Sequence, residues 1–412
     1  MSATLENLEY KKNNIPVIFE KHKTLPIFNM QLIFKNSGYI NDLKYPGITN
    51  LTAKMLNEGT KIDGAIEYAR KLENDAISIY TATGLETFVI EVSCLKQEIP
   101  TALRYLKELL DDPNISKNTL EKVKKLQISK LKQKENDFDY VASSNLKKLT
   151  YKGSALANTS SGDIKSLKTI DLNDIKSNLN NILNIDNLII VVGGDIKIED
   201  IKTSIKPILT TLKKNGTKTL NRIKPIQNQD ELVVKKETQQ AYIYFTSPFD
   251  IQYNSKQNHI AKVASFILGG GGFGSRMMEE IRVKHGLAYS TYGHISNKKS
   301  YSHFTGYLQT KLENRKKAQD MVNQIVKEFV KNGVTQQELE AAKNFLSGSE
   351  PLRTETFSQR LNRAFMLYYK GLPFDYPKKE LQMIENLTLE ELNNFIKSHK
   401  EIERLSFSIV TK

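Results

Sequence analysis

Three histidines in the C-terminal half are the first candidates for chemistry. His285, His294 and His303 follow one another at intervals of nine residues. Imidazole is a common zinc ligand, but a zinc site needs three or four ligands that converge on one point. These histidines fall in separate predicted strand and turn segments, and no acidic residue is placed with them as a ligand set. We interpret them as surface or packed histidines.

A glycine-rich segment is the second candidate. Gly269, Gly271 and Gly274 fit the pattern Gly-x-Gly-x-x-Gly. A dinucleotide site also requires a strand before this loop and an acidic residue on the next strand, where it binds the ribose. Here a helical stretch, His259–Leu268, precedes the loop, and no βαβ unit surrounds it. The context therefore excludes nucleotide binding.

The segment from Pro46 to Thr60 predicts a helix whose polar face could carry functional groups. Ile48, Leu51 and Met55 recur at helical spacing, and Pro46-Gly47 marks the start. By itself this is an ordinary amphipathic helix. With Leu32–Gly38 before it and Gly59-Thr60 after it, however, the segment resembles the signature helix of the insulinase-like inverted zinc peptidases, which reads His-x-x-Glu-His.

The resemblance implies a zinc site whose ligands are missing here. In the family, the two histidines bind zinc, the glutamate polarises the attacking water, and a later helix supplies a third, glutamate ligand. Asn50 and Lys54 stand in place of the histidines, and Ala53 in place of the glutamate. An amide is a poor zinc ligand, alanine offers no base, and an ammonium group repels a dication. The stretch that matches the later helix, Gln127–Leu131, contains no carboxylate, and the first half of the chain has one histidine, His22. We therefore expect this chain to bind no metal and no cofactor, and to have no catalytic residue of its own.

The second half carries a segment that resembles the family's second-domain signature, which is a glycine loop, Ser-Arg, a short helix and Arg-x-x-x-Gly-Leu-Ala-Tyr. In the family, an arginine and a tyrosine seven residues later hold the substrate, and Arg282 and Tyr289 match both in type and spacing. A guanidinium can clamp a carbonyl or carboxylate, and a phenol can donate to its oxygen. The alternative is an arginine at a helix end and a packed tyrosine. The four-glycine run resembles the loop of non-catalytic subunits, so we expect Gly269, Gly270, Gly271 and Gly272 to form a flexible loop that contacts peptide.

The predicted elements repeat. Each half begins with strands, continues with helices and ends in a strand, Leu188–Gly194 in the first and Arg404–Val410 in the second. The sequence therefore predicts an α+β fold of two homologous domains, each a mostly antiparallel sheet packed with helices. The expected N-terminal domain covers residues 1–212, a polar linker covers 213–230, and the C-terminal domain covers 231–412.

Composition excludes several other classes. The net charge is +14, but the excess is mostly lysine spread along the whole chain, without the aromatic interleaving of nucleic-acid platforms. No apolar run is long enough to span a bilayer. The single cysteine, Cys94, excludes an internal disulfide. Residues 1–10 lack the features of a signal peptide, so the expected location is cytoplasmic, or periplasmic if a leader has been removed.

These observations leave three hypotheses. The first is a non-catalytic, peptide-binding subunit that pairs with a zinc-bearing homologue, as in the mitochondrial processing peptidase branch of the family. The second is a stand-alone or homodimeric structural scaffold in which Arg282 and Tyr289 are inherited without use. The third is an active peptidase with another metal arrangement, for which no ligand set is visible. The retained Arg282 and Tyr289 favour the first hypothesis.

Overall fold

The computed structural model describes residues 3–412. The chain forms two compact units, and neither is continuous in sequence. Of the described residues, the first unit comprises 3–132, 158–220 and 354–366, and the second comprises 133–157, 221–353 and 367–412. Each unit contains a β-sheet with helices packed on it, which confirms the predicted α+β class.

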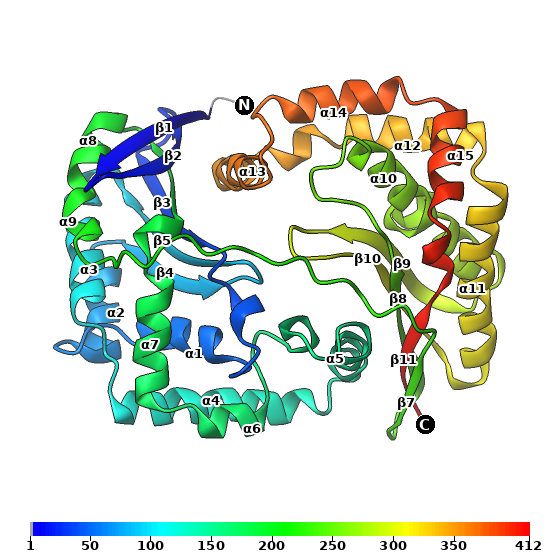
Figure 1. The fold of residues 1–412 in the computed structure, drawn as a ribbon, viewed down its shortest axis with the longest axis horizontal. Coiled ribbons are helices and arrows are strands. Elements are labelled where there is room, and N and C mark those ends of the chain that lie inside the picture. Colours follow the sequence, from blue (N-terminus) through cyan, green and yellow to red (C-terminus); the bar gives the residue numbers. More distant parts are fainter. Residues whose placement is uncertain (1–2) are drawn as a thin grey trace. The chain divides into compact units, whose positions relative to one another are not determined.

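The sheet of the first unit has six strands in the order β1-β2-β6-β3-β5-β4. In β3, Phe28, Met30, Leu32 and Phe34 alternate along the strand and enter one core cluster, as the period of a strand requires. Figure 1 shows this sheet with α3, α8 and α9 on one side. The strands are β1 (Thr4–Tyr10), β2 (Asn13–Lys21), β3 (Ile27–Lys35), β4 (Ser78–Thr83), β5 (Thr87–Leu95) and β6 (Leu188–Gly194). The helices are α1 (Ile48–Leu56), α2 (Gly64–Asn74), α3 (Ile99–Asp111), α4 (Lys117–Lys134), α6 (Ile164–Thr169), α7 (Leu172–Ile182), α8 (Ile198–Ser204) and α9 (Lys206–Leu209).

The sheet of the second unit has five strands in the order β7-β11-β8-β10-β9. Its core joins Ile243 and Phe245 of β8 and Phe304 of β10 to the surrounding helices. The strands are β7 (Glu231–Lys235), β8 (Gln240–Pro248), β9 (Ala288–Asn297), β10 (Ser302–Lys311) and β11 (Ser406–Thr411). The helices are α5 (Phe138–Thr150), α10 (Asn258–Ser265), α11 (Arg315–Asn332), α12 (Gln336–Gly348), α14 (Tyr376–Glu385) and α15 (Leu389–Ser398), while α13 (Phe357–Tyr369) begins in the first unit and ends in the second.

The two sheets share one topology, which confirms the internal duplication. In each, the closing strand lies between a parallel and an antiparallel neighbour: β6 lies between β2 and β3, and β11 lies between β7 and β8. The other two strands continue the sheet in the same way, as β5-β4 and β10-β9. The first sheet differs only by the additional edge strand β1, which the sequence pattern did not predict.

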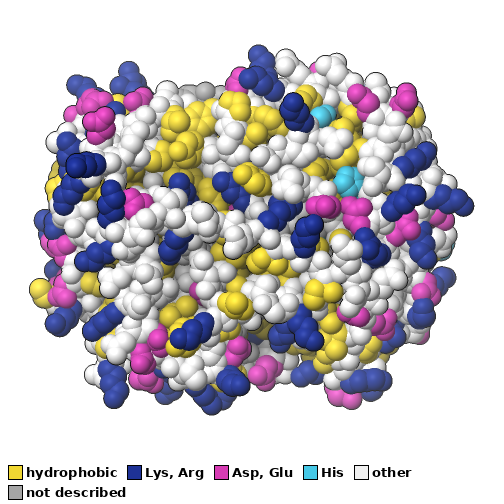
Figure 2. Space-filling view, viewed as in Figure 1, with side chains coloured by type: hydrophobic (Ala, Val, Ile, Leu, Met, Phe, Trp, Pro, Cys, Tyr) yellow, Lys and Arg dark blue, Asp and Glu magenta, His cyan; other side chains and the backbone are white. Residues whose placement is uncertain are grey.

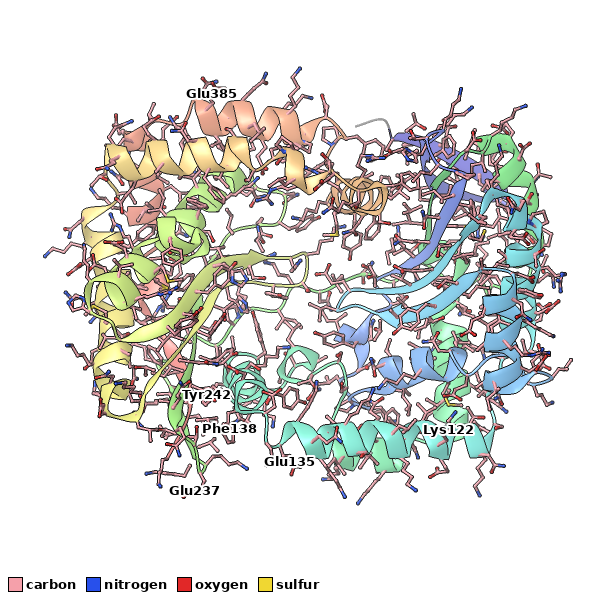
Figure 3. All side chains as sticks on the ribbon, turned by 180° about the vertical axis from the view of Figure 1, so that it is seen from behind. Lys122, Glu135, Phe138, Glu237, Tyr242 and Glu385 are labelled. Atoms are coloured by element: carbon pink, nitrogen blue, oxygen red, sulfur yellow. The ribbon has the colours of Figure 1, made fainter. Side chains whose placement is uncertain are left out.

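Each unit takes one helix from the other half of the chain. Helix α5 packs on the second sheet, where Phe138 lies 5.5 Å from Tyr242 between ring centroids and Asp139 accepts a hydrogen bond from Tyr244 at 3.0 Å. Figure 3 shows Phe138 and Tyr242 next to each other. The first residues of α13 pack on the first sheet, where Phe357 stacks on His22 at 4.8 Å. A single division at 213–230 therefore does not describe the compact units, because α5 and α13 each pack on the sheet that the other half of the chain forms.

The segment from residue 214 to residue 230 has no helix or strand, but hydrogen bonds hold it. In the first unit, the buried Asn184 donates to the carbonyl of Gly216 at 2.7 Å. In the second unit, Arg222 donates to the carbonyl of Ile251 at 2.5 Å.

No helix within residues 3–412 has the length and apolar composition that a bilayer span requires. Figure 2 shows lysine and arginine side chains scattered among acidic and neutral ones over the visible face, without a continuous basic patch there.

Candidate functional site

Helix α1 carries Asn50, Ala53 and Lys54. Contacts at its N-terminus hold it in position. Gly47 precedes it with φ 93°, and a Cβ there would lie 2.8 Å from the carbonyl oxygen of Ser161, so only glycine fits. The buried Asp42 carboxylate accepts hydrogen bonds from the Thr49 amide at 3.1 Å and the Thr49 hydroxyl at 2.5 Å. The position of the helix is therefore set by backbone fit and by a buried polar contact.

The Asp42 contact makes stability depend on pH. Burial raises the pKa of Asp42 to about 7, although the hydrogen bonds from Thr49 oppose the shift. Below the unfolded-state pKa of about 4, both states carry the proton. Above it, only the unfolded state releases the proton until the pH passes the folded-state pKa. Asp42 therefore lowers stability as pH rises from about 4 to about 7.

We expect Asp42→Asn to remove this dependence. The free energy of unfolding of the wild type, measured relative to Asp42→Asn by urea denaturation, should fall by about 2–3 kcal/mol between pH 5 and pH 8. Any loss of stability that the asparagine amide itself causes is the same at both pH values, so it cancels when the values at pH 5 and pH 8 are compared. Parallel pH profiles for the two proteins would contradict the buried, proton-binding carboxyl.

Lys54 stands where the resemblance places the second histidine ligand, and Gln127 begins the stretch that matches the helix of the third ligand. The Lys54 ammonium donates to Gln127 Oε1 at 2.8 Å, and Gln127 Nε2 donates to the carbonyl of Ser161 at 2.7 Å. Gln127 lies on α4 and is 1% exposed. In a zinc peptidase, this place holds side chains that bind the zinc cation. Here it holds a positively charged ammonium group, which is bonded to an amide. The contact between Lys54 and Gln127 was not foreseen from the sequence.

The other two positions of α1 add no ligand. Asn50 Oδ1 is buried and accepts no hydrogen bond within residues 3–412. Ala53 is 3% exposed and packs in the core. Across the described chain, no group of three or more histidine, cysteine, aspartate or glutamate side chains could hold a metal ion.

The histidines of the C-terminal half take part in packing and hydrogen bonds. His303 pairs with the hydroxyl of Tyr151 at 2.8 Å, and burial lowers its pKa to about 3. Burial also lowers the pKa of His294, whose ring packs on Tyr292 at 5.2 Å. His285 Nδ1 lies 2.9 Å from the carbonyl oxygen of Glu280.

Arg282 and Tyr289 come together in the second unit, and a third residue joins them. The Arg282 guanidinium carbon lies 4.8 Å from the ring centroid of Tyr289 and 4.7 Å from that of Phe273. Tyr289 is 83% exposed and Phe273 is 67% exposed. Within residues 3–412, no carboxylate forms an ion pair with Arg282, so its N–H donors remain available to a carbonyl or carboxylate. The role of Arg282 and Tyr289 in substrate binding stays a prediction.

Phe273 was not predicted, because its role depends on where the glycine segment folds. The helix predicted to Leu268 ends at Ser265 and continues as a π-helical turn, Phe266–Gly270. Arg282 lies on a second π-helical segment, Met278–Lys284. π-helical turns are rare and frequent at functional sites.

Packing accounts for two of the four glycines. A Cβ on Gly269 would lie 2.7 Å from the carbonyl oxygen of Gly293 in β9, and a Cβ on Gly271 would lie 2.8 Å from the ring of Phe266. Gly272 has φ 56°, which favours glycine. Gly270 would meet the carbonyl oxygen of Ser265 at 3.1 Å. Contact of these glycines with peptide stays a prediction.

The fold and the site define a class of inactive zinc-peptidase-like proteins. Its features are duplicated α+β halves, a signature helix without ligands, and a paired arginine and tyrosine. Comparison with known proteins agrees. Residues 18–163 match the family described as insulinase (peptidase family M16), and residues 169–346 match the peptidase M16 inactive domain. The non-peptidase homolog YmxG of Helicobacter pylori is 41% identical over 411 residues, which cover 100% of this chain and 95% of that protein. The chain therefore belongs to peptidase family M16.

More distant relatives have the same fold or match part of the chain. The crystal structure of a peptidase M16 inactive domain from Pseudomonas fluorescens superposes with a TM-score of 0.90 at 23% identity, covering 99% of this chain and 97% of that one. The mitochondrial-processing peptidase subunit beta of Saccharomyces cerevisiae is 23% identical over 168 residues, which cover 40% of this chain and 36% of that protein.

Proposed function

We propose that this protein is a non-catalytic, peptide-binding member of family M16 that completes a peptidase whose zinc is carried by a homologous partner subunit. The observation that carries the proposal is the contact between Lys54 and Gln127 at 2.8 Å. It puts a fixed positive charge at the position of the metal ligands, so hydrolysis requires ligands from another chain.

The exposed group around Arg282 supports the peptide-binding part. The Arg282 guanidinium lies over the rings of Phe273 and Tyr289 and forms no ion pair among the described residues, so it can donate to a peptide carbonyl or carboxylate. Exposed aromatic and arginine side chains are the residue types that dominate binding energy at protein interfaces.

Two relatives support the remaining parts. The Helicobacter pylori relative is named a non-peptidase homolog, which agrees with a chain that has no zinc ligands. The yeast relative is named as a subunit of a peptidase, which agrees with a heteromeric assembly. In the proposed assembly this chain supplies substrate contacts, and the partner supplies the zinc.

A cleavage assay tests the proposal. The chain alone is expected to cleave no unfolded peptide, and mixing it with an intact His-x-x-Glu-His homologue from the same genome should produce zinc-dependent cleavage. Replacing Arg282 with alanine and Tyr289 with phenylalanine should lower kcat/KM of the mixture by at least about tenfold, because a charged and a neutral hydrogen bond to substrate are lost. The measurement is the initial cleavage rate of a fluorogenic peptide.

Lys284→Ala is the matched control, since Lys284 is an exposed cation on the same helical segment and pairs with Glu280 at 2.7 Å. It should leave the rate unchanged. Cleavage by the chain alone would overturn the proposal in favour of an active peptidase. Failure to associate with the homologue, combined with self-association, would support the structural scaffold instead.

A further inference from the structure

A cavity of about 370 Å³ in the second unit lies apart from Arg282 and Tyr289 and has no role in the proposed function. One wall is the linker stretch 222–227, and another is the end of β8 with Phe249. The start of β10 at Ser302 completes it, together with the last residue of α15 and the chain that follows, residues 398–404. Its volume is in the range of small-molecule sites.

Positive charge gathers on this lining. Arg222, Lys224 and Arg404 all line the cavity. Arg222 is held by the carbonyl of Lys298 at 3.0 Å, and Arg404 by Gln227 Oε1 at 2.7 Å. Within residues 3–412, no ion pair neutralises Lys224 or Arg404. Guanidinium groups that are already held in place bind an anion with little loss of side-chain entropy.

The acidic group inside the lining is already engaged. Glu401 Oε1 accepts from His399 Nδ1 at 2.7 Å and from the amide of Asp250 at 3.0 Å. The His399 ring stacks on the buried Phe249 with a centroid distance of 4.3 Å, and both residues line the cavity. The remaining carboxylate, Asp250, is exposed. The lining therefore combines Lys224 and Arg404, which form no ion pair among the described residues, with the aromatic pair of Phe249 and His399.

Ser302 provides an independent observation. It lines the cavity, is 4% exposed, and its hydroxyl has no hydrogen-bond partner in the described residues. A buried hydroxyl without a partner costs free energy, and an incoming polar group would remove that cost.

We propose that this cavity binds a small organic carboxylate with a flat apolar body. The carboxylate binds between Lys224 and Arg404 and accepts from the Ser302 hydroxyl, while its body packs against the His399 ring. Because the linker forms one side, the bound carboxylate holds residues 222–227 on the second unit.

Benzoate and its neutral isostere benzamide test the proposal on the full chain. At constant ionic strength, isothermal titration calorimetry should detect benzoate binding at least about tenfold tighter than benzamide binding, the worth of one charge-assisted hydrogen bond. Hydrogen exchange of the Ile223 and Ile226 amides, which donate to carbonyls at 2.7 and 2.8 Å, should slow when benzoate is added. Inorganic phosphate is tested in a second titration. Phosphate binding without benzoate binding would overturn the proposal that the ligand is a carboxylate.

Variants separate binding from folding. Lys224→Gln combined with Arg404→Gln should weaken benzoate binding by at least about tenfold, and Lys400→Gln, an exposed cation of the same turn, should not. Ser302→Ala should weaken benzoate binding several-fold without lowering Tm, because the lost hydroxyl makes no bond in the free protein. Equal affinity for benzoate and benzamide, absence of benzoate binding, or full affinity in the double variant would each overturn the proposal.

Discussion

Replacement of Arg360 by alanine is expected to lower the free energy of unfolding by about 3–5 kcal/mol, the usual cost of removing one partner of a buried ion pair. Arg360 Nε lies 2.7 Å from Glu20 Oε1, and the Glu20 side chain is 2% exposed. Its second oxygen has no hydrogen-bond partner among the described residues. Without Arg360, β2 keeps a buried charge that nothing compensates. Urea denaturation measures the loss.

Two controls define the cause. Arg353→Ala removes an arginine that is 50% exposed and lies 3.8 Å from Glu350, so it should cost no more than about 1 kcal/mol. Adding Glu20→Gln to Arg360→Ala removes the buried charge and should restore part of the lost stability. Equal losses for Arg360→Ala and Arg353→Ala would rule out the buried pair as a major contribution.

Rebuilding the metal site should raise the zinc affinity of the chain by a large factor. A variant with Asn50→His, Ala53→Glu, Lys54→His and Gln127→Glu is expected to bind zinc at least about 100-fold more tightly than the wild type. The reason is geometric, because the side chains at positions 54 and 127 already meet at 2.8 Å. Competition with a chromogenic chelator at pH 7.5 measures the affinity.

The matched control keeps Lys54 and changes only the other three residues. It should gain little affinity, because an ammonium group remains where the second histidine must coordinate. Stoichiometric zinc binding by the wild type would contradict the assignment of a lost site. So would a folded fourfold variant with unchanged affinity, since it would mean that positions 54 and 127 do not face a common metal position.

Local sequence patterns predicted most elements of the fold. The predicted helix within Pro46–Thr60 and the predicted strand Leu188–Gly194 agree with α1 and β6, because side-chain periodicity is a local property. Helices α5 and α13 were not predicted. Even a correct helix prediction would not have identified their partners, because the sheet on which an amphipathic helix packs depends on contacts far apart in the chain, such as Phe138 with Tyr242.

The candidate site shows the same division. The sequence by itself determined that the zinc ligands are absent, because the chemistry of Asn50, Ala53, Lys54 and the single histidine of the first half does not depend on folding. Tertiary structure alone decided what replaced them. The contact between Lys54 and Gln127 joins residues 73 positions apart, and Phe273 meets Arg282 only because the glycine segment folds against β9. Residue type limits the chemistry that a chain can perform, whereas long-range packing brings the groups together.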